Sequence, residues 1–278
     1  MQPYLVMLFC CLPLGLVSGF MAGLFGIGGG IITVPGLLLL FDWMQFDEAS
    51  NYHLAVGTSL CAIIFSSLLA VYRHQQYLKL DIPVIRLLVP GVVAGFLVAA
   101  YFFADLPRTI LQLGFVVFLG CVLLRLLAVP QHKNAATTRM KNSYPSRLGL
   151  KRRVGLCIGF LAGFIAPLLG IGGGTMIIPL LDRYAIPMPH ILAVASFIGM
   201  VIALFSTVNS IYVGGHHANL PVYSLGYVYW PAALGISLTS FLTVPAGVYY
   251  AHHLDQTVLK RLFAGLLVLI ILNMLIRH

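Results

Sequence analysis

The stretch GFMAGLFGIGGGIITVP at residues 19–35 returns as GFIAPLLGIGGGTMIIP at residues 163–179, an offset of 144 residues. Extending the comparison back to Gly15 and Gly159 gives 11 identities in 21 positions. The identical residues are Gly15, Gly19, Phe20, Ala22, Leu24, Gly26, Ile27, Gly28, Gly29, Gly30 and Pro35, each with its counterpart 144 residues later. Each copy places a run of glycines, which cannot stay regularly helical, inside an otherwise apolar segment.

The composition indicates a polytopic integral membrane protein of the all-α class. Of its 278 residues, 60% are hydrophobic and only 8% are charged, whereas soluble domains have roughly 25% charged residues. Several uncharged runs exceed the roughly 20 apolar residues that a spanning helix needs. The longest polar stretch covers only residues 131–153, which leaves no room for a soluble domain.

The net charge of +9 is concentrated in that polar stretch, which contains no acidic residue. A basic loop between hydrophobic halves is typical of the cytoplasmic side of a membrane protein. A nucleic-acid or partner site in the loop is the alternative. The acidic residues Asp42, Asp47 and Glu48 share a short loop without a cation, and we expect them on the opposite, external side.

The chain divides into two membrane repeats, at residues 1–130 and 154–278, joined by the basic loop at 131–153. The expected apolar segments lie near 4–41, 52–72, 83–104, 107–129, 153–181, 190–213, 225–250 and 256–277. The repeat extends beyond the glycines, because His53-Leu-Ala-Val-Gly-Thr-Ser59 resembles His190-Ile-Leu-Ala-Val-Ala-Ser196. Glycines spaced by four, as at Gly15, Gly19 and Gly23, predict close helix packing.

The relative orientation of the repeats depends on the first segment of each half. If that segment crosses once, the copies are parallel; if the glycine run folds it back, they are inverted. Inversion would place Arg183, Lys260 and Arg261 inside, whereas parallel copies would place Arg277 and the uncharged 213–224 loop there. The positive-inside tendency therefore favours inverted repeats.

The glycine runs are the predicted binding site, because Gly-interrupted segments in corresponding places of two halves are the best sequence indication of a transporter's site. A helix starting after the glycines, at Ile31 or Thr175, would direct unpaired N–H groups and its positive dipole end at the break, as anion sites require. The alternative is that the glycines only allow close helix crossing. The predicted glycine contacts are Gly26, Gly28, Gly29, Gly30, Gly170, Gly172, Gly173 and Gly174.

Hydroxyl groups in the repeated element complete the predicted site: Thr58, Ser59 and Ser196. The alternative for each is a hydrogen bond to its own helix backbone. His53 and His190 could couple transport to protons, although interfacial histidines are the commoner case. The cysteines, in apolar segments without metal-ligand spacing, are expected to be buried small hydrophobes. We find no enzyme motif and predict no cofactor and no metal site.

The doubled GxxxGxxGIGGGxxxxP pattern, followed by AVGTS and divided by a basic loop, resembles the TauE/SafE family of membrane permeases, the sulfite exporter family. The resemblance extends from Gly15 to about residue 275. It implies an inner-membrane transporter of small anions, such as sulfite, sulfonates or related organic anions, with the glycine motifs at the transport site. One departure is Ala195-Ser196-Phe197, where the family commonly has a threonine-serine pair.

Two other functions stay open from the sequence. One is a membrane scaffold or accessory subunit without transport activity. The other is a carrier of cations or neutral solutes, which the scarcity of acidic residues in the apolar segments disfavours. The expected partners are a small anion and the lipid bilayer, with no nucleic acid, and the sequence also permits a homo-oligomer.

Overall fold

The computed structural model describes residues 3–103, 106–128, 152–181, 184, 186, 188–215, 220–253, 264–265 and 267–272. Its elements are α1 (Pro3–Phe25), α2 (Gly30–Trp43), α3 (Glu48–Gln75), α4 (Ile82–Phe103), α5 (Arg108–Ala128), α6 (Arg152–Leu169), α7 (Gly174–Leu181), α8 (Met188–Gly214), β1 (Ser224–Leu225), β2 (Val228–Tyr229) and α9 (Trp230–His253). Within the described part, six helices are long and apolar enough to cross a membrane. The chain is therefore a multi-pass, mainly α-helical membrane protein.

The glycine runs interrupt the helices, as their composition predicts. α1 ends at Phe25 and α2 begins at Gly30, while α6 ends at Leu169 and α7 begins at Gly174. The expected starts at Ile31 and Thr175 are wrong by one residue. The reason is that the Gly29 carbonyl already accepts hydrogen bonds from the amides of residues 32 and 33, at 3.0 and 3.1 Å, so helical bonding begins inside the run.

The first glycine run turns the chain back on itself. Gly29 of the break lies against Ser18 of α1, and Gly36 of α2 lies against Leu14. As residue numbers rise along α2 they fall along α1, so the two helices are antiparallel. The break is thus a fold-back between a long helix and a shorter one.

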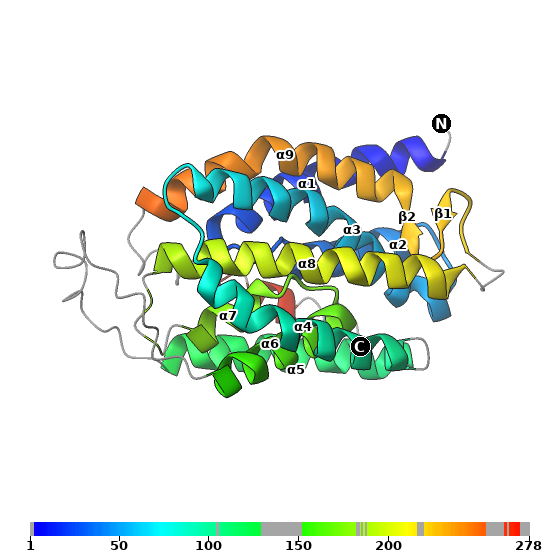
Figure 1. The fold of residues 1–278 in the computed structure, drawn as a ribbon. Helices are drawn as coiled ribbons and strands as arrows, with labels where there is room; N and C mark the ends of the chain where they lie inside the picture. The colour runs from blue at the N-terminus through cyan, green and yellow to red at the C-terminus, as the bar shows by residue number, and fades with distance from the viewer. Residues whose placement is uncertain are drawn as a thin grey trace.

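Close glycine-mediated contacts join helices from different halves of the chain. α1 packs along α9, and α4 packs along α6. Gly15, Gly19 and Gly23 lie in that order against Ile236, Ser240 and Val244, so α1 and α9 are parallel. Figure 1 shows α1 beside α9 at one edge of the bundle, with α4, α5 and α6 at the other. The prediction of close helix packing at these glycines is confirmed.

The helices α4 and α6 also pack closely through glycines. Gly91 and Gly95 of α4 lie against Leu156 and Phe160 of α6, again in the same order, so these helices are also parallel. A side chain at Gly95 would overlap the Phe160 carbonyl. The first helix of each half therefore packs on a helix of the other half: α1 on α9, and α6 on α4.

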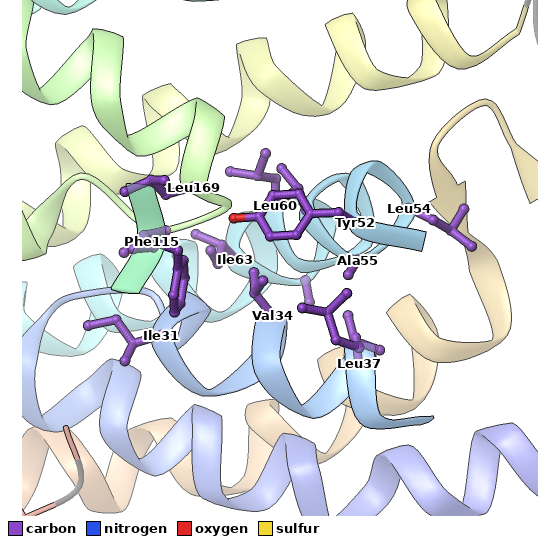
Figure 2. Close-up of a cluster of buried hydrophobic side chains, with 14 of the residues drawn as sticks. Ile31, Val34, Leu37, Tyr52, Leu54, Ala55, Leu60, Ile63, Phe115 and Leu169 are labelled. Atoms are coloured by element: carbon purple, nitrogen blue, oxygen red, sulfur yellow. The ribbon is translucent and has the colours of Figure 1, made fainter. Parts of the chain in front are cut away.

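The helices α3 and α8 pass through the middle of the bundle, between the two layers (Figure 1). Gly57 of α3 lies against Ser210 of α8, whereas Ser67 lies near Gly199, so the two helices are antiparallel. Apolar side chains of α2, α3, α5 and α6 form the main core around the fully buried Tyr52 (Figure 2). Its hydroxyl donates to the Leu111 carbonyl at 3.2 Å, which satisfies the polar end of the ring.

Two expectations about segments need correction. The segment predicted at 225–250 starts at Trp230, because β1 and β2 form a hairpin first, with Ser224 opposite Tyr229. The turn is stabilised by the Tyr227 amide, which donates to the Ser210 carbonyl at 3.0 Å. Of the basic loop at 131–153, all but the last two residues lie outside the described residues, as does most of the segment at 256–277.

The cysteine expectation is confirmed only in part. All five thiols are free, and Cys11 and Cys61 are buried. Cys121 and Cys157 are exposed, contrary to expectation. The physical reason is that a membrane helix keeps apolar residues on its outer face as well, so an apolar segment does not by itself predict burial.

Candidate functional site

The two glycine runs cross in direct backbone contact. Gly172 lies against the Ile27 carbonyl, and Gly174 lies against the Gly26 carbonyl. Gly30 meets the Gly170 carbonyl in the same way. A Cβ atom at any of these three glycines would overlap a carbonyl oxygen, so only glycine fits. The two runs therefore meet, and these glycines allow the close crossing.

Left-handed backbone conformations supply a second reason for glycine. Gly26, Gly28 and Gly29 have φ values of 62°, 74° and 81°. In the second run only Gly170, at 66°, is left-handed. Because an L side chain in this region is strained, the first run depends on glycine more heavily than the second.

Serine and threonine hydroxyls satisfy carbonyl oxygens that the breaks leave without helical partners. Ser59 donates to the Gly170 carbonyl at 3.0 Å, and its oxygen lies 2.6 Å from that of Thr33. Ser66 lies 3.1 Å from the Gly28 carbonyl. In hydrocarbon, such groups must find partners within the protein. The hydroxyls therefore satisfy the Gly170 and Gly28 carbonyls, and the first amides of each following helix lack helical partners.

The predicted hydroxyl residues separate into two groups. Ser59 and Ser196 lie at the crossing: Ser196 borders Gly26, while its hydroxyl donates to the Leu192 carbonyl of its own helix at 2.9 Å. Thr58 lies elsewhere, and its hydroxyl accepts a hydrogen bond from the Tyr229 amide at 3.0 Å. Consecutive helical residues are about 100° apart around the axis, so Thr58 and Ser59 cannot face the same run.

The sequence analysis missed four residues at the crossing: Thr33, Ser66, Ser67 and Gly199. Ser67 is only 1% exposed, and its hydroxyl has no hydrogen-bond partner in the described part of the chain. The signal that could have found Ser66 and Ser67 is helical periodicity, because residues seven or eight positions after Ser59 lie on the same helix face.

A small cavity lies beside the crossing, where α3, α4, α6 and α8 meet. Its volume of about 10 Å³ is the least space that one water molecule needs. The hydroxyl of Ser206, buried and without a partner among the described residues, belongs to its wall. The lining residues are Leu60, Phe96, Ala99, Ala100, Phe103, Pro167, Ser206, Asn209 and Ser210. The polar part of its lining comes from α8, and the other helices contribute apolar residues.

Two histidines of α3 contact other helices. His53 is buried: its Nε2 lies 3.1 Å from the Phe103 carbonyl, and its ring packs on Tyr227. His74, which the sequence did not single out, places Nδ1 3.2 Å from Nε2 of His252. Among the residues searched, no group of three or more His, Cys, Asp or Glu side chains could hold a metal ion.

Charged side chains are scarce around the glycine runs. The sequences of α1, α7, α8 and α9 contain no lysine, arginine, aspartate or glutamate. The polar groups at the crossing are therefore backbone amides and carbonyls together with hydroxyls. Hydrogen-bond donors of this kind bind anions at helix starts without the cost of burying a cation.

Comparison with known proteins places the chain among membrane transporters. It is 31% identical over 270 residues, with 96% of this chain and 97% of the relative covered, to a probable membrane transporter protein of Haemophilus influenzae. A probable membrane transporter protein of Methanocaldococcus jannaschii is 28% identical, with 95% and 94% covered. The probable membrane transporter protein YunE of Bacillus subtilis is 27% identical, with 73% and 77% covered.

No solved structure matches this chain significantly. The profile of one family, Sulfite exporter TauE/SafE, matches residues 11–274, which is nearly the whole sequence. The chain therefore belongs to the TauE/SafE family of sulfite exporters.

Proposed function

We propose that this chain is an inner-membrane permease for small anions, with sulfite, sulfonates or related sulfur-containing or organic anions as its substrates. The main observation that supports the proposal is the contact between the two helix breaks, where serine hydroxyls donate hydrogen bonds to backbone carbonyls. The Ser59 hydroxyl donates a hydrogen bond to the Gly170 carbonyl, and the Ser66 hydroxyl donates one to the Gly28 carbonyl. Carbonyls satisfied by hydroxyls, beside helix starts whose first amides lack helical partners, favour an anion over a cation.

The predicted substrate contacts are the glycine runs at residues 26–30 and 170–174, with Ser59 and Ser196 beside them. An anion in hydrocarbon needs several donors, and hydrogen bonds to charged groups are worth about 1.5–3 kcal/mol each. Thr58 acts indirectly in this proposal, because its hydroxyl accepts from the Tyr229 amide. It anchors the hairpin beside α3 and leaves the binding of the anion to its neighbours.

Inverted repeats are part of the proposal, with residues 1–130 and 154–278 as the two units. Their support is the set of helix directions: α1 is parallel to α9, α4 is parallel to α6, and α3 is antiparallel to α8. Because short connections join α3 to α4 and α8 to α9, these directions require α1 and α6 to run oppositely. Inversion in turn allows one central site to open to either side of the membrane.

The orientation in the membrane follows from the charges. We place the basic segment 131–153 in the cytoplasm and the loop around residues 42–48 outside. A single cysteine at position 138, in a cysteine-free background, should react with an impermeant maleimide only after the cells are permeabilised. A tag inserted after Asn219 should be accessible from outside. Labelling of position 138 in intact cells would overturn the orientation, and a tag that stays hidden would overturn inversion.

The function itself is tested by transport into liposomes. The purified protein, reconstituted at known density, should carry radiolabelled sulfite or methanesulfonate down a gradient, whereas sodium and an uncharged solute such as glycerol should cross no faster than in protein-free liposomes. Protein-free liposomes give the background. Selective flux of sodium or glycerol would favour the cation or neutral-solute carrier. No flux of any solute would favour a scaffold or accessory subunit.

A further inference from the structure

The hydroxyl of Ser67 is the most conspicuous unused donor near the glycine runs. A serine inside a helix usually bonds to a carbonyl one turn earlier, and the neighbouring Ser66 does so with the Ile63 carbonyl at 3.3 Å. Ser67 is 1% exposed, yet its Oγ has no hydrogen-bond partner among the described residues. A buried hydroxyl without a partner is costly and calls for an explanation, such as a ligand that is absent here.

Gly199 of α8 lies opposite this hydroxyl and, because it has no side chain, leaves a space beside it. An ideal Cβ atom at Gly199 would lie 3.7 Å from Ser67 Oγ, 3.7 Å from the Gly173 amide nitrogen and 3.9 Å from Gly172 Cα. These are ordinary van der Waals distances, so the space admits a group of about methyl size. The two nearest polar atoms around it are hydrogen-bond donors, one from each half of the chain.

The Gly173 amide stands at the start of α7. The Gly173 carbonyl accepts bonds from the amides of Met176 and Ile177, at 3.2 and 3.1 Å, so this residue caps the helix. We find no acceptor for its own N–H among the described residues. The positive end of the helix dipole adds to the attraction of this amide for a negative oxygen.

We infer that Ser67 and the Gly173 amide together bind one oxygen of the transported anion, in the space left open by Gly199. This inference rests on the proposed anion transport and locates its binding position. The ligand class is a small pyramidal or tetrahedral oxyanion. The repeat does not produce a second copy of this site. The counterpart of Gly199 in the first half is Ala62, and the counterpart of Ser67 in the second half is Leu204, which has no hydroxyl.

The test uses two substitutions that change the site in opposite ways. Gly199→Ala fills the space with a methyl group that meets no atom closer than 3.7 Å, so the fold should be unaffected. Ser67→Ala removes one donor and leaves the space open. Gly120→Ala is the matched control, because a Cβ there meets nothing within 4 Å and the residue lies in α5.

The measurements are sulfite and methanesulfonate flux in liposomes, the KM for each anion, and the melting temperature of the purified protein. Each site variant should raise KM at least about tenfold, the equivalent of one lost hydrogen bond to a charged group. Melting temperatures should stay at the wild-type value, and Gly120→Ala should match wild type throughout.

Three outcomes distinguish an error in the binding position from an error in the proposed transport function. If wild type carries anions and both site variants keep its KM, the position is wrong while the proposed function stands. If Gly199→Ala changes the melting temperature but neither variant changes KM, the space holds structural water and the inference fails. If wild type carries no anion, the proposed function fails and this inference fails with it.

Discussion

The two glycine runs carry the same letters, GIGGG, at residues 26–30 and 170–174, yet the structure constrains them differently. In the first run, Gly26, Gly28 and Gly29 are left-handed. In the second run, Gly170 alone is left-handed, and Gly173 faces the flexible end of Ile202. The helices that follow also differ, with 14 residues in α2 and 8 in α7. The two copies of the motif therefore differ in backbone conformation and in packing, although their sequences are identical.

The difference assigns separate tasks to the two runs. The first run is fixed by backbone conformation as well as by close crossing, so it acts as the rigid side of the site. In the second run Gly172 and Gly174 are fixed by contact with backbone carbonyls, whereas a Cβ at Gly173 would meet only side chains, of which the flexible end of Ile202 is nearest. This contrast predicts that equal substitutions in the two runs have unequal effects.

The largest effect is expected at Gly29. Gly29→Val would place a β-branched side chain at φ 81°, with its Cβ 2.6 Å from the Ser18 carbonyl oxygen. A left-handed conformation alone costs an L residue about 1–2 kcal/mol, and the overlap adds to it. We expect anion flux to fall below detection and the melting temperature to drop clearly. Flux at the wild-type rate in normally folded protein would show that the first run is not the rigid side.

A smaller, graded effect distinguishes neighbouring glycines of the second run. Gly174→Ala would press a methyl group onto the Gly26 carbonyl, whereas Gly173→Ala would meet only Ile202 Cδ1, at 2.5 Å, which can rotate away. Overpacking of this kind costs about 1–3 kcal/mol when the backbone must move. The midpoint of thermal unfolding should fall markedly for Gly174→Ala and little for Gly173→Ala. Equal shifts would contradict the contrast.

The smallest effect compares the two hydroxyls of the repeated element. Ser59→Ala would leave the buried Gly170 carbonyl without its partner, at a cost of about 1–3 kcal/mol. Ser196→Ala should cost less, because its hydroxyl bonds only to Leu192 of its own helix, whose carbonyl stays within the helical ladder. Chemical unfolding of the two variants measures the difference. A larger loss for Ser196→Ala would reverse our ranking of the two halves.

Much of the fold could be predicted because membrane-spanning helices are long runs of apolar residues. The long apolar runs gave α3, α4, α5 and α8 with ends correct to within a few residues, and the glycines gave the breaks after Phe25 and Leu169. The hairpin before Trp230 was missed, since its four strand residues are as apolar as the helix they precede. The burial of His53 could not be predicted, because it depends on contacts from α4 and the hairpin.

The candidate site was predictable in type and only partly in detail. Repetition identified the glycines, and the structure brings both runs together with Ser59 and Ser196. Thr58 was grouped with them because it belongs to the same repeated element, although its hydroxyl bonds to the Tyr229 amide. Thr33, Ser66, Ser67 and Gly199 carried no repeated signal, so the contacts across α2, α3 and α8 were needed to find them.

By itself the sequence determined that this protein lies in a membrane, that it consists of two related halves, and that each half has a broken helix. These properties depend on local composition and on repetition, which can be read without knowing any contact. Only the tertiary structure decided which helices exchange partners, how each glycine is constrained, and which hydroxyl remains without a partner. These depend on distances between segments more than 100 residues apart, such as Ser67 and Gly173, and no local pattern encodes such distances.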